Sequence, residues 1–175
     1  MEDPGPAGDF EHRGWTMPYW NDELGKLQSE LLFGSDALLL GRVTYEEFAA
    51  AWPSRSGDPF TEYINSMPKF VASRTLQEPL TWNARLLKGD AAKAVQELKQ
   101  QAGKSILIYG SSELVNTLMR HDLIDVYCVM LFPVALGTGK RFFGDGGKKV
   151  TLRLTSSTTT STGVAVLTYG LPHSQ

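Results

Sequence analysis

The most constraining feature of the sequence is a short apolar run that passes directly into an amphipathic segment. Residues 36–40 form this run, which ends at Gly41, and a helical pattern follows over residues 44–51. Residues 105–109 repeat the arrangement ahead of a second helical pattern over residues 112–120. Apolar runs bounded in this way are typical of buried strands. Strands that alternate with helices predict a largely parallel sheet covered by helices.

Other periodic stretches complete the expected order of elements. Proline and glycine in residues 1–18 predict neither helix nor strand there. Alternating apolar residues near the end of the chain, on either side of Thr162-Gly163, predict an antiparallel hairpin. The sequence thus predicts an α/β fold on a sheet that is parallel in its first part. The remaining expected helices cover residues 22–32, 60–66 and 90–102, and the remaining strands cover 69–72, 125–131, 150–160 and 164–169.

Bulk properties narrow the class of protein. The 175 residues favour a single domain over residues 1–175. The net charge is −2 and no basic block is present, so we expect neither nucleic acid nor a membrane surface as a partner. The single cysteine, the lack of a signal-peptide pattern and the lack of a long apolar run together favour a cytoplasmic protein.

Two strand-to-helix junctions carry residues suited to phosphate. Arg42 and Thr44 directly follow Gly41, and residues 110–112 (Gly-Ser-Ser) follow the strand predicted over residues 105–109. Helix N-termini present unpaired N–H groups, and arginine adds bidentate charged hydrogen bonds. A plain turn with a solvated arginine, and an ordinary serine cap, are the alternatives. The presence of both junctions favours a nucleotide that bridges them.

Further candidate ligand-binding residues follow the third strand and the N-terminal loop. Ser73 and Arg74 come after residues 69–72, where Arg74 either contacts the 2′-phosphate of NADP or lies free on the surface. Trp15 and Trp20 either wall a pocket for a flat heterocycle or cover a small core. Asp22 is the nearest acid, although a carboxylate at a helix start also has a structural role.

Several other chemistries are not expected from the sequence. Residues 136–141 contain glycines and a lysine but lack the first glycine and the Ser/Thr of a phosphate-binding loop. The three histidines are far apart in sequence, so no metal site is predicted. No G-x-S-x-G motif points to a hydrolase. Cys128 lies in an apolar stretch and is expected to be an inert, buried thiol.

Taken in order along the chain, these motifs resemble the dihydrofolate-reductase-like superfamily. They are most similar to the branch that contains the C-terminal reductase domain of the riboflavin-biosynthesis protein RibD. The resemblance covers about residues 36–170. The segments that carry it are Leu-Leu-Leu-Gly-Arg-Val-Thr-Tyr-Glu (38–46), Val-Ala-Ser-Arg-Thr-Leu (71–76), Ile-Leu-Ile-Tyr-Gly-Ser-Ser-Glu-Leu (106–114), Leu-Ile-Asp-Val-Tyr (123–127) and Pro-Val-Ala-Leu-Gly-Thr-Gly-Lys-Arg-Phe-Phe (133–143).

The resemblance implies an αβα sandwich on a mixed, mainly parallel sheet with a C-terminal antiparallel hairpin. It also implies NADPH as cofactor, a small-molecule substrate and a homodimer. The implied activity is reduction of 5-amino-6-(phosphoribosylamino)uracil, with Trp15 and Trp20 beside the substrate. The residues implied to bind the cofactor are Gly41, Arg42, Thr44, Ser73, Arg74, Gly110, Ser111, Ser112 and Leu114.

The sequence departs from the family pattern in two places. Members of the family open with an apolar strand at the centre of the sheet, and nothing before residue 20 fits it. The acid that protonates pterin in dihydrofolate reductases has only a rough match in Asp22 and Glu23, so no catalytic residue is assigned and Asp22 is the candidate. An NADPH-dependent reductase of a heterocycle is the leading interpretation. A dimeric nucleotide-binding protein without turnover, and a plain structural domain, remain as alternatives.

Overall fold

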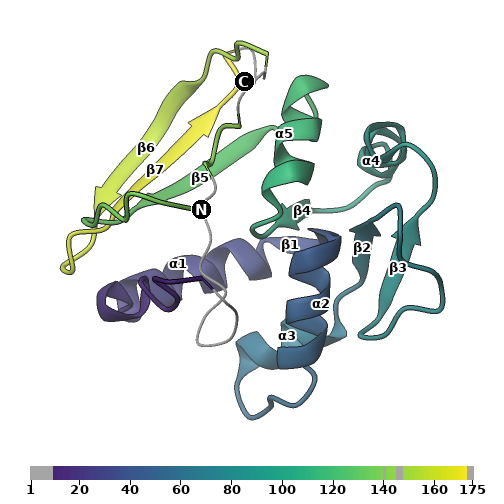
Figure 1. Ribbon diagram of the computed structural model, residues 1–175, viewed down its shortest axis with the longest axis horizontal. Coiled ribbons are helices and arrows are strands. Elements are labelled where there is room, and N and C mark those ends of the chain that lie inside the picture. Colours follow the sequence, from purple (N-terminus) through teal and green to yellow (C-terminus); the bar gives the residue numbers. More distant parts are fainter. Residues whose placement is uncertain (1–9, 140, 145–147, 173–175) are drawn as a thin grey trace.

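The computed structural model describes residues 10–139, 141–144 and 148–172. Helices and strands alternate through the first two thirds of this part of the chain (Figure 1), as predicted. The elements are the 3-10 helix η1 (Met17–Tyr19), α1 (Asp22–Phe33), β1 (Ser35–Gly41), α2 (Arg42–Ala51), α3 (Pro59–Ser66), β2 (Lys69–Ala72), β3 (Ala84–Leu87), α4 (Ala91–Lys99), β4 (Ser105–Ile108), α5 (Ser112–Arg120), β5 (Val126–Leu131), β6 (Arg153–Thr159) and β7 (Ala165–Gly170).

The strands form two sheets rather than the single mixed sheet that we predicted. Four parallel strands have the order β3-β2-β1-β4, and three antiparallel strands have the order β5-β7-β6. Among the described residues, no strand pairs with the outer edges of β4 and β5, so the two sheets are not joined by backbone hydrogen bonds. The expected hairpin is present as β6 and β7, with Gly163 at φ +84° in its turn.

Helices cover both faces of the four-stranded sheet. Successive side chains of a strand point to opposite faces. Leu38 and Leu40 of β1 belong to a core shared with Tyr45 of α2 and Ile64 of α3. Leu39 lies in a second core, which contains side chains from α4 and α5. The αβα arrangement predicted for the chain is therefore confirmed, and the buried run of β1 reflects its central position.

Two helices hold the two sheets against each other. On one face, α1 packs against the four-stranded sheet through Leu32 and against the three-stranded sheet through Leu24, which contacts Val164 and Val166. On the other face, the core of α5 includes both Leu39 and Tyr127, one from each sheet. The two sheets are thus covered by the same pair of helices, as Figure 1 shows.

Element boundaries differ from the prediction where local signals compete with periodicity. Helix α4 ends at Lys99 rather than near residue 102, because the chain turns at Gln100, the C-cap residue. Strand β3 was not predicted, since its four residues follow Trp82 and Asn83, which both have positive φ, and carry no clear alternation. The N-terminus of α1 matches the prediction, because the side chain of Asn21 accepts a hydrogen bond from the Leu24 N–H.

Candidate functional site

The two predicted junctions lie side by side and are joined by one serine. Gly41 ends β1, and its N–H donates a 2.9 Å hydrogen bond to Ser111 Oγ at the start of α5. The same hydroxyl lies 3.1 Å from Thr44 Oγ1 in α2 and 2.9 Å from the carbonyl oxygen of Tyr109. The N-terminal ends of α2 and α5 are therefore fixed next to each other at the carboxyl ends of neighbouring parallel strands, where open α/β sheets bind ligands.

The backbone at the second junction is tight. Gly110 and Ser111 both have positive φ, at +53° and +56°. A Cβ on residue 110 would lie 3.3 Å from Thr44 Oγ1. Glycine at this position therefore lets the chain after β4 pass close to α2 and leaves its backbone uncovered.

Two arginines lie near these junctions but differ in their partners. Arg42 begins α2 and pairs with Glu46 at 2.8 Å, with both side chains 46% exposed. Arg74 is exposed in the turn after β2, and no described residue forms an ion pair with it. Ser73 shapes this turn, because its hydroxyl accepts the N–H groups of Thr75 and Leu76.

The remaining predicted cofactor residues have structural contacts. Leu114 is only 7% exposed and lies in the core formed by α5, so its contribution at the junction is packing against β1. Ser112 is the first residue of α5, and its carbonyl oxygen accepts a hydrogen bond from Asn116.

All of the predicted cofactor residues border one large cleft, which we name the central cleft. Its volume is about 2340 Å³, and it runs between β4 and β5 over the junctions. The predicted cofactor residues that line it are Gly41, Arg42, Thr44, Ser73, Arg74, Gly110, Ser111, Ser112 and Leu114. Every residue that we predicted to bind the cofactor thus lines the same cleft, and direct contacts join Gly41, Thr44 and Ser111 within it.

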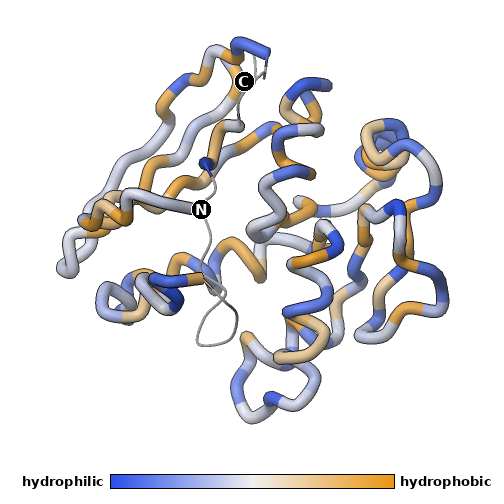
Figure 2. Tube along the Cα trace, in the orientation of Figure 1, coloured by the Kyte–Doolittle hydropathy of each residue, from blue (hydrophilic) through white to orange (hydrophobic). Residues whose placement is uncertain are grey.

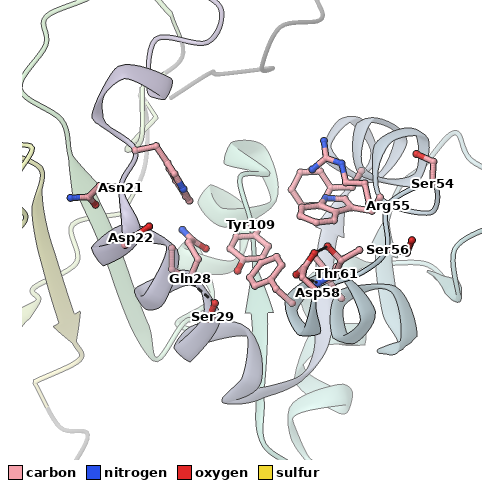
Figure 3. A pocket seen from close by; sticks show the side chains of 16 residues that line it. Asn21, Asp22, Gln28, Ser29, Ser54, Arg55, Ser56, Asp58, Thr61 and Tyr109 are labelled. Atoms are coloured by element: carbon pink, nitrogen blue, oxygen red, sulfur yellow. Dashed lines mark hydrogen bonds between the residues drawn. The ribbon is translucent and has the colours of Figure 1, made fainter.

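A second cavity, which we name the aromatic pocket, adjoins the central cleft. It has a volume of about 1150 Å³ and lies between α1 and the α2–α3 segment. In Figure 3, Asp22 and Gln28 come from α1 on one side, Arg55 and Asp58 lie on the other, and Tyr109 lies between them. The aromatic side chains that line it are Trp20, Phe48, Trp52, Phe60 and Tyr109.

Tyr109 contributes an unusual polar group to this pocket. Its hydroxyl is buried and has no hydrogen-bond partner among the described residues. Burial, and to a smaller extent the nearby Cys128 thiol, raises the pKa of Tyr109 above its ordinary value. The hydroxyl is therefore a neutral donor, and a buried donor without a partner costs free energy that a ligand acceptor would recover.

The charged residues of the pocket have different surroundings. Asp58 caps α3, and its hydrogen bonds from the Thr61 hydroxyl and N–H hold the pKa of its carboxyl below the usual value. The guanidinium of Arg55 stacks over Trp52 at 4.7 Å from the ring centroid. Asp22 is exposed in the first turn of α1 and lines the same pocket.

The two predicted substrate tryptophans lie in different cavities. Trp20 lines the aromatic pocket and is 45% exposed. Trp15 lines the central cleft instead, and its ring packs edge-on against Phe132 at 5.0 Å. The loop therefore does not present both rings to one ligand, because η1 separates them.

Sequence reasoning missed most of the aromatic pocket. Phe48 and Trp52 are four residues apart, which places them on one face of α2, and this spacing was an available signal. Tyr109 directly precedes the second junction, but nothing in the sequence shows that its hydroxyl lacks a partner. Gln28, Phe48 and Tyr109 line both cavities, so the pocket and the cleft share a wall.

Two classes of site find no support in the described part of the chain. Within it, no group of three or more His, Cys, Asp or Glu side chains is arranged to hold a metal ion. None of the described helices has the length and hydrophobicity that crossing a bilayer requires.

Comparison with known proteins assigns the chain to a family. The model of the RibD C-terminal domain matches residues 7–166. The uncharacterized protein YyaP of Bacillus subtilis (strain 168) is 31% identical over 139 residues, which are 77% of this chain and 73% of that protein. The uncharacterized protein YwjB of the same organism is also 31% identical, over 119 residues, and the chain spans 64% of its length.

Solved structures share the fold. A putative riboflavin biosynthesis protein from Shewanella sp. PV-4 superposes with a TM-score of 0.63 at 24% identity, over 80% of this chain and 76% of that one. Acinetobacter baumannii RibD also gives a TM-score of 0.63, at 16% identity over 86% of this chain, which spans about half (51%) of the RibD chain. This protein therefore belongs to the RibD C-terminal domain family, whose members are reductase-like and have the fold of dihydrofolate reductase.

Proposed function

We propose that this protein is an NADPH-dependent reductase that acts on a small, flat heterocyclic substrate. The observation that carries the proposal is the bond from the Gly41 N–H to Ser111 Oγ, which fixes two helix N-termini side by side in the central cleft. Membership of a reductase-like family supports it.

The residues of the central cleft fit the phosphates of a dinucleotide. The starts of α2 and α5 present backbone N–H groups and the positive ends of two helix dipoles. Gly110 has no side chain to hinder a phosphate, and Arg42 and Arg74 supply positive charge. Arg74 would bind the 2′-phosphate that distinguishes NADPH from NADH, and NADPH when bound supplies the hydride.

The aromatic pocket would hold the substrate beside the cofactor. Phe48, Trp52 and Trp20 offer ring faces to a flat heterocycle and exclude water from it. The Tyr109 hydroxyl would donate a hydrogen bond to a substrate carbonyl or ring nitrogen. The main contribution of these residues is to position the substrate against the nicotinamide. Asp22 or water would supply a proton.

The first substrate to test is 5-amino-6-(5-phosphoribosylamino)uracil. A structurally similar protein of Thermotoga maritima is described as a diaminohydroxyphosphoribosylaminopyrimidine deaminase and 5-amino-6-(5-phosphoribosylamino)uracil reductase, with a TM-score of 0.60 at 15% identity over 86% of this chain and 49% of that one. This likeness shows the fold alone, so the choice of substrate is part of the proposal.

The cofactor assignment is tested by titrating the protein with NADPH and NADH while following tryptophan fluorescence. Replacing Arg74 with alanine is expected to weaken NADPH binding at least about tenfold, or about 1.4 kcal/mol, and to leave NADH binding unchanged. Arg120→Ala is the matched control, because Arg120 ends α5 and does not line either cavity. The assignment is contradicted if Arg74→Ala lowers the affinity for NADPH and for NADH equally, or lowers neither.

Turnover separates the reductase from a nucleotide-binding protein without activity. Oxidation of NADPH that depends on the substrate is expected, and Tyr109→Phe should raise the KM for the substrate without changing the Kd for NADPH. Nucleotide binding with no oxidation for any heterocycle tried would favour the alternative.

We also propose a homodimer in the cytoplasm. Three apolar side chains of the three-stranded sheet are exposed, namely Val126 (59%), Leu131 (61%) and Leu154 (50%). Burying them between two copies would remove this apolar surface from water. Light scattering on the purified protein measures the oligomeric state directly, and a monomer at micromolar concentration would contradict the proposal.

A further inference from the structure

The loop between α2 and α3 forms one wall of the aromatic pocket. Arg55 and Asp58 of this loop line the pocket, as does Trp52 at the C-terminal end of α2. Residues 53–58 are Pro-Ser-Arg-Ser-Gly-Asp, and Figure 2 shows no strongly hydrophobic residue among them. A segment of this kind buries little apolar surface, so its conformation depends on the hydrogen bonds that its backbone makes.

The side chain of Asn65 in α3 supplies two of these hydrogen bonds. Its Nδ2 lies 3.1 Å from the carbonyl oxygen of Trp52 and 3.3 Å from that of Arg55. Its Oδ1 accepts a 2.7 Å hydrogen bond from the indole Nε1–H of Trp82. Because an indole N–H only donates and a carbonyl oxygen only accepts, the amide of Asn65 satisfies all of these partners in one orientation alone.

Trp82, which lies just before β3, is itself held by neighbouring elements. Lys69 of β2 places its Nζ 4.1 Å from the centre of the Trp82 ring, and Phe48 of α2 packs edge-on against the same ring at 6.2 Å. The N–H of the preceding residue, Thr81, donates a 3.0 Å hydrogen bond to the Tyr45 hydroxyl of α2. The indole N–H therefore has a fixed position, and it determines which way the amide of Asn65 faces.

We propose that Asn65 is a positioning residue for the aromatic pocket: oriented by Trp82, it sets the places of Trp52 and Arg55 and thereby the affinity for the heterocyclic substrate. The inference rests on the proposed function, because that function places the substrate in this pocket. Asn65 and Trp82 line neither the aromatic pocket nor the central cleft, so they act through the loop rather than by touching a ligand. Since Arg55 stacks on Trp52, a displaced loop would move both side chains.

The other hydrogen bonds of the loop are local. Asp58 accepts from the Thr61 N–H and hydroxyl as the N-cap of α3, and the Arg55 N–H donates to the Trp52 carbonyl oxygen within the same turn. Within the described chain, the Asn65 amide is the side chain outside the loop that bonds to the backbone of Arg55. The position of Arg55 should therefore respond to a change at Asn65.

The test compares three variants with the natural protein. Asn65→Asp keeps an oxygen that accepts from Trp82 but removes both donors to the loop, so that two carbonyl oxygens face a carboxylate. Trp82→Phe keeps an aromatic ring but removes the N–H that orients Asn65. Asn83→Asp is the matched control, because the Asn83 side chain donates to the Ser66 carbonyl oxygen of α3 at 2.8 Å and does not line the aromatic pocket.

The first readout needs no ligand. The guanidinium of Arg55 lies over the Trp52 ring at 4.7 Å, so the ring current shifts the Arg55 Nε–H resonance upfield. We expect this shift to be largely lost in Asn65→Asp and in Trp82→Phe and to be kept in Asn83→Asp. An Arg55 resonance that keeps its shift in either of the first two variants, or loses it equally in the control, overturns the proposal.

The second readout is steady-state kinetics with 5-amino-6-(5-phosphoribosylamino)uracil. Asn65→Asp should raise the KM for this compound about tenfold, keep kcat within about twofold and leave the Kd for NADPH unchanged, whereas Asn83→Asp should change none of them. A lower kcat at unchanged KM, or an equal loss of NADPH affinity, overturns the proposal. If the natural protein does not reduce this compound, the proposed substrate is wrong, and the Arg55 resonance still decides the role of Asn65.

Discussion

At the scale of single residues, the Ser111 hydroxyl has the largest effect on the geometry of the site. It accepts the Gly41 N–H and contacts Thr44, so three elements depend on one oxygen atom. Ser111→Ala should destabilise the fold by about 1–2 kcal/mol, because the Gly41 N–H loses its partner. Urea unfolding measures this, and Ser112→Ala is the matched control. A loss of stability that is equal in the two variants would contradict this role.

Lys69 is a buried charge outside the candidate site. Its side chain is fully buried in β2, its Nζ donates to the Asn65 carbonyl oxygen at 2.8 Å, and it lies 4.1 Å from the centre of the Trp82 ring. Burial lowers the pKa of Lys69 from 10.5 to about 8. The folded state therefore releases the proton at a lower pH than the unfolded state.

The pKa shift of Lys69 predicts how stability changes with pH. Between about pH 8 and 10.5 the unfolded state binds more protons, so the contribution of Lys69 to folding stability rises with pH across this range. The rise should be of order 1–3 kcal/mol and absent in Lys69→Met. Thermal unfolding of both proteins at several pH values measures the difference. Parallel pH curves for the two proteins would show that folding does not lower the pKa of Lys69.

At the scale of elements, Glu23 fixes α1 to the turn between β6 and β7. Its carboxylate accepts hydrogen bonds from the Ser161 N–H and hydroxyl, both at 2.7 Å, and these bonds hold the pKa of Glu23 below 4.5. The stabilisation is present above the unfolded pKa and is lost as the pH falls through the folded value.

This contact predicts an acid-dependent docking of the hairpin turn. The Ser161 amide resonance should titrate below pH 4.5 in the natural protein and should not titrate in Glu23→Gln. Hydrogen exchange of the Ser161 amide should also be faster in Glu23→Gln. Glu30→Gln is the control, because Glu30 lies in the same helix and only approaches Lys26 at 3.9 Å. A Ser161 resonance that titrates in Glu23→Gln would mean that another group is responsible.

Most helices and strands could be predicted because each has a local signal. The spacing of Leu24 and Leu32 and the caps at Asn21 and Asp90 are encoded within a few residues. Strand β3 could not be predicted, because its four residues show no clear alternation of apolar and polar side chains. Its pairing with β2 holds it in the extended conformation instead. The split between the sheets was also missed, since the edges of β4 and β5 are properties of strand order rather than of any segment.

The candidate site was likewise predicted from the sequence only in part. Gly41, Arg42 and residues 110–112 carried a signal because glycine and side chains suited to phosphate follow two separate apolar runs. The bond by which Ser111 joins the two junctions could not be predicted, because it depends on β1 and β4 being neighbours in the sheet. The aromatic pocket was largely missed, because Phe48 and Trp52 look like core residues until the opposing surface of α1 is known.

At the scale of the whole molecule, α1 connects two sheets that share no backbone hydrogen bonds in the described chain. Leu24 and Leu32 are both fully buried in this helix, one against each sheet. Leu24→Ala should speed hydrogen exchange in β7 and leave β1 nearly unchanged, whereas Leu32→Ala should do the reverse. Each cavity should cost about 2–5 kcal/mol of local stability.

The two variants are each other's control, since they make the same change in the same helix. Selective effects would show that the sheets open as separate units. If both variants accelerate exchange equally in β1 and β7, the two sheets unfold as one cooperative unit and α1 is not an independent link.

The wall that the aromatic pocket shares with the central cleft has a thermodynamic consequence. Gln28, Phe48 and Tyr109 present one side to each cavity, so a ligand in either one dehydrates and orders side chains that the other must contact. A second ligand would then contact side chains that are already ordered, so its binding would cost less conformational entropy. Linkage makes this coupling reciprocal: whatever factor the proposed nucleotide would add to the affinity of the proposed heterocycle, the heterocycle would add to that of the nucleotide.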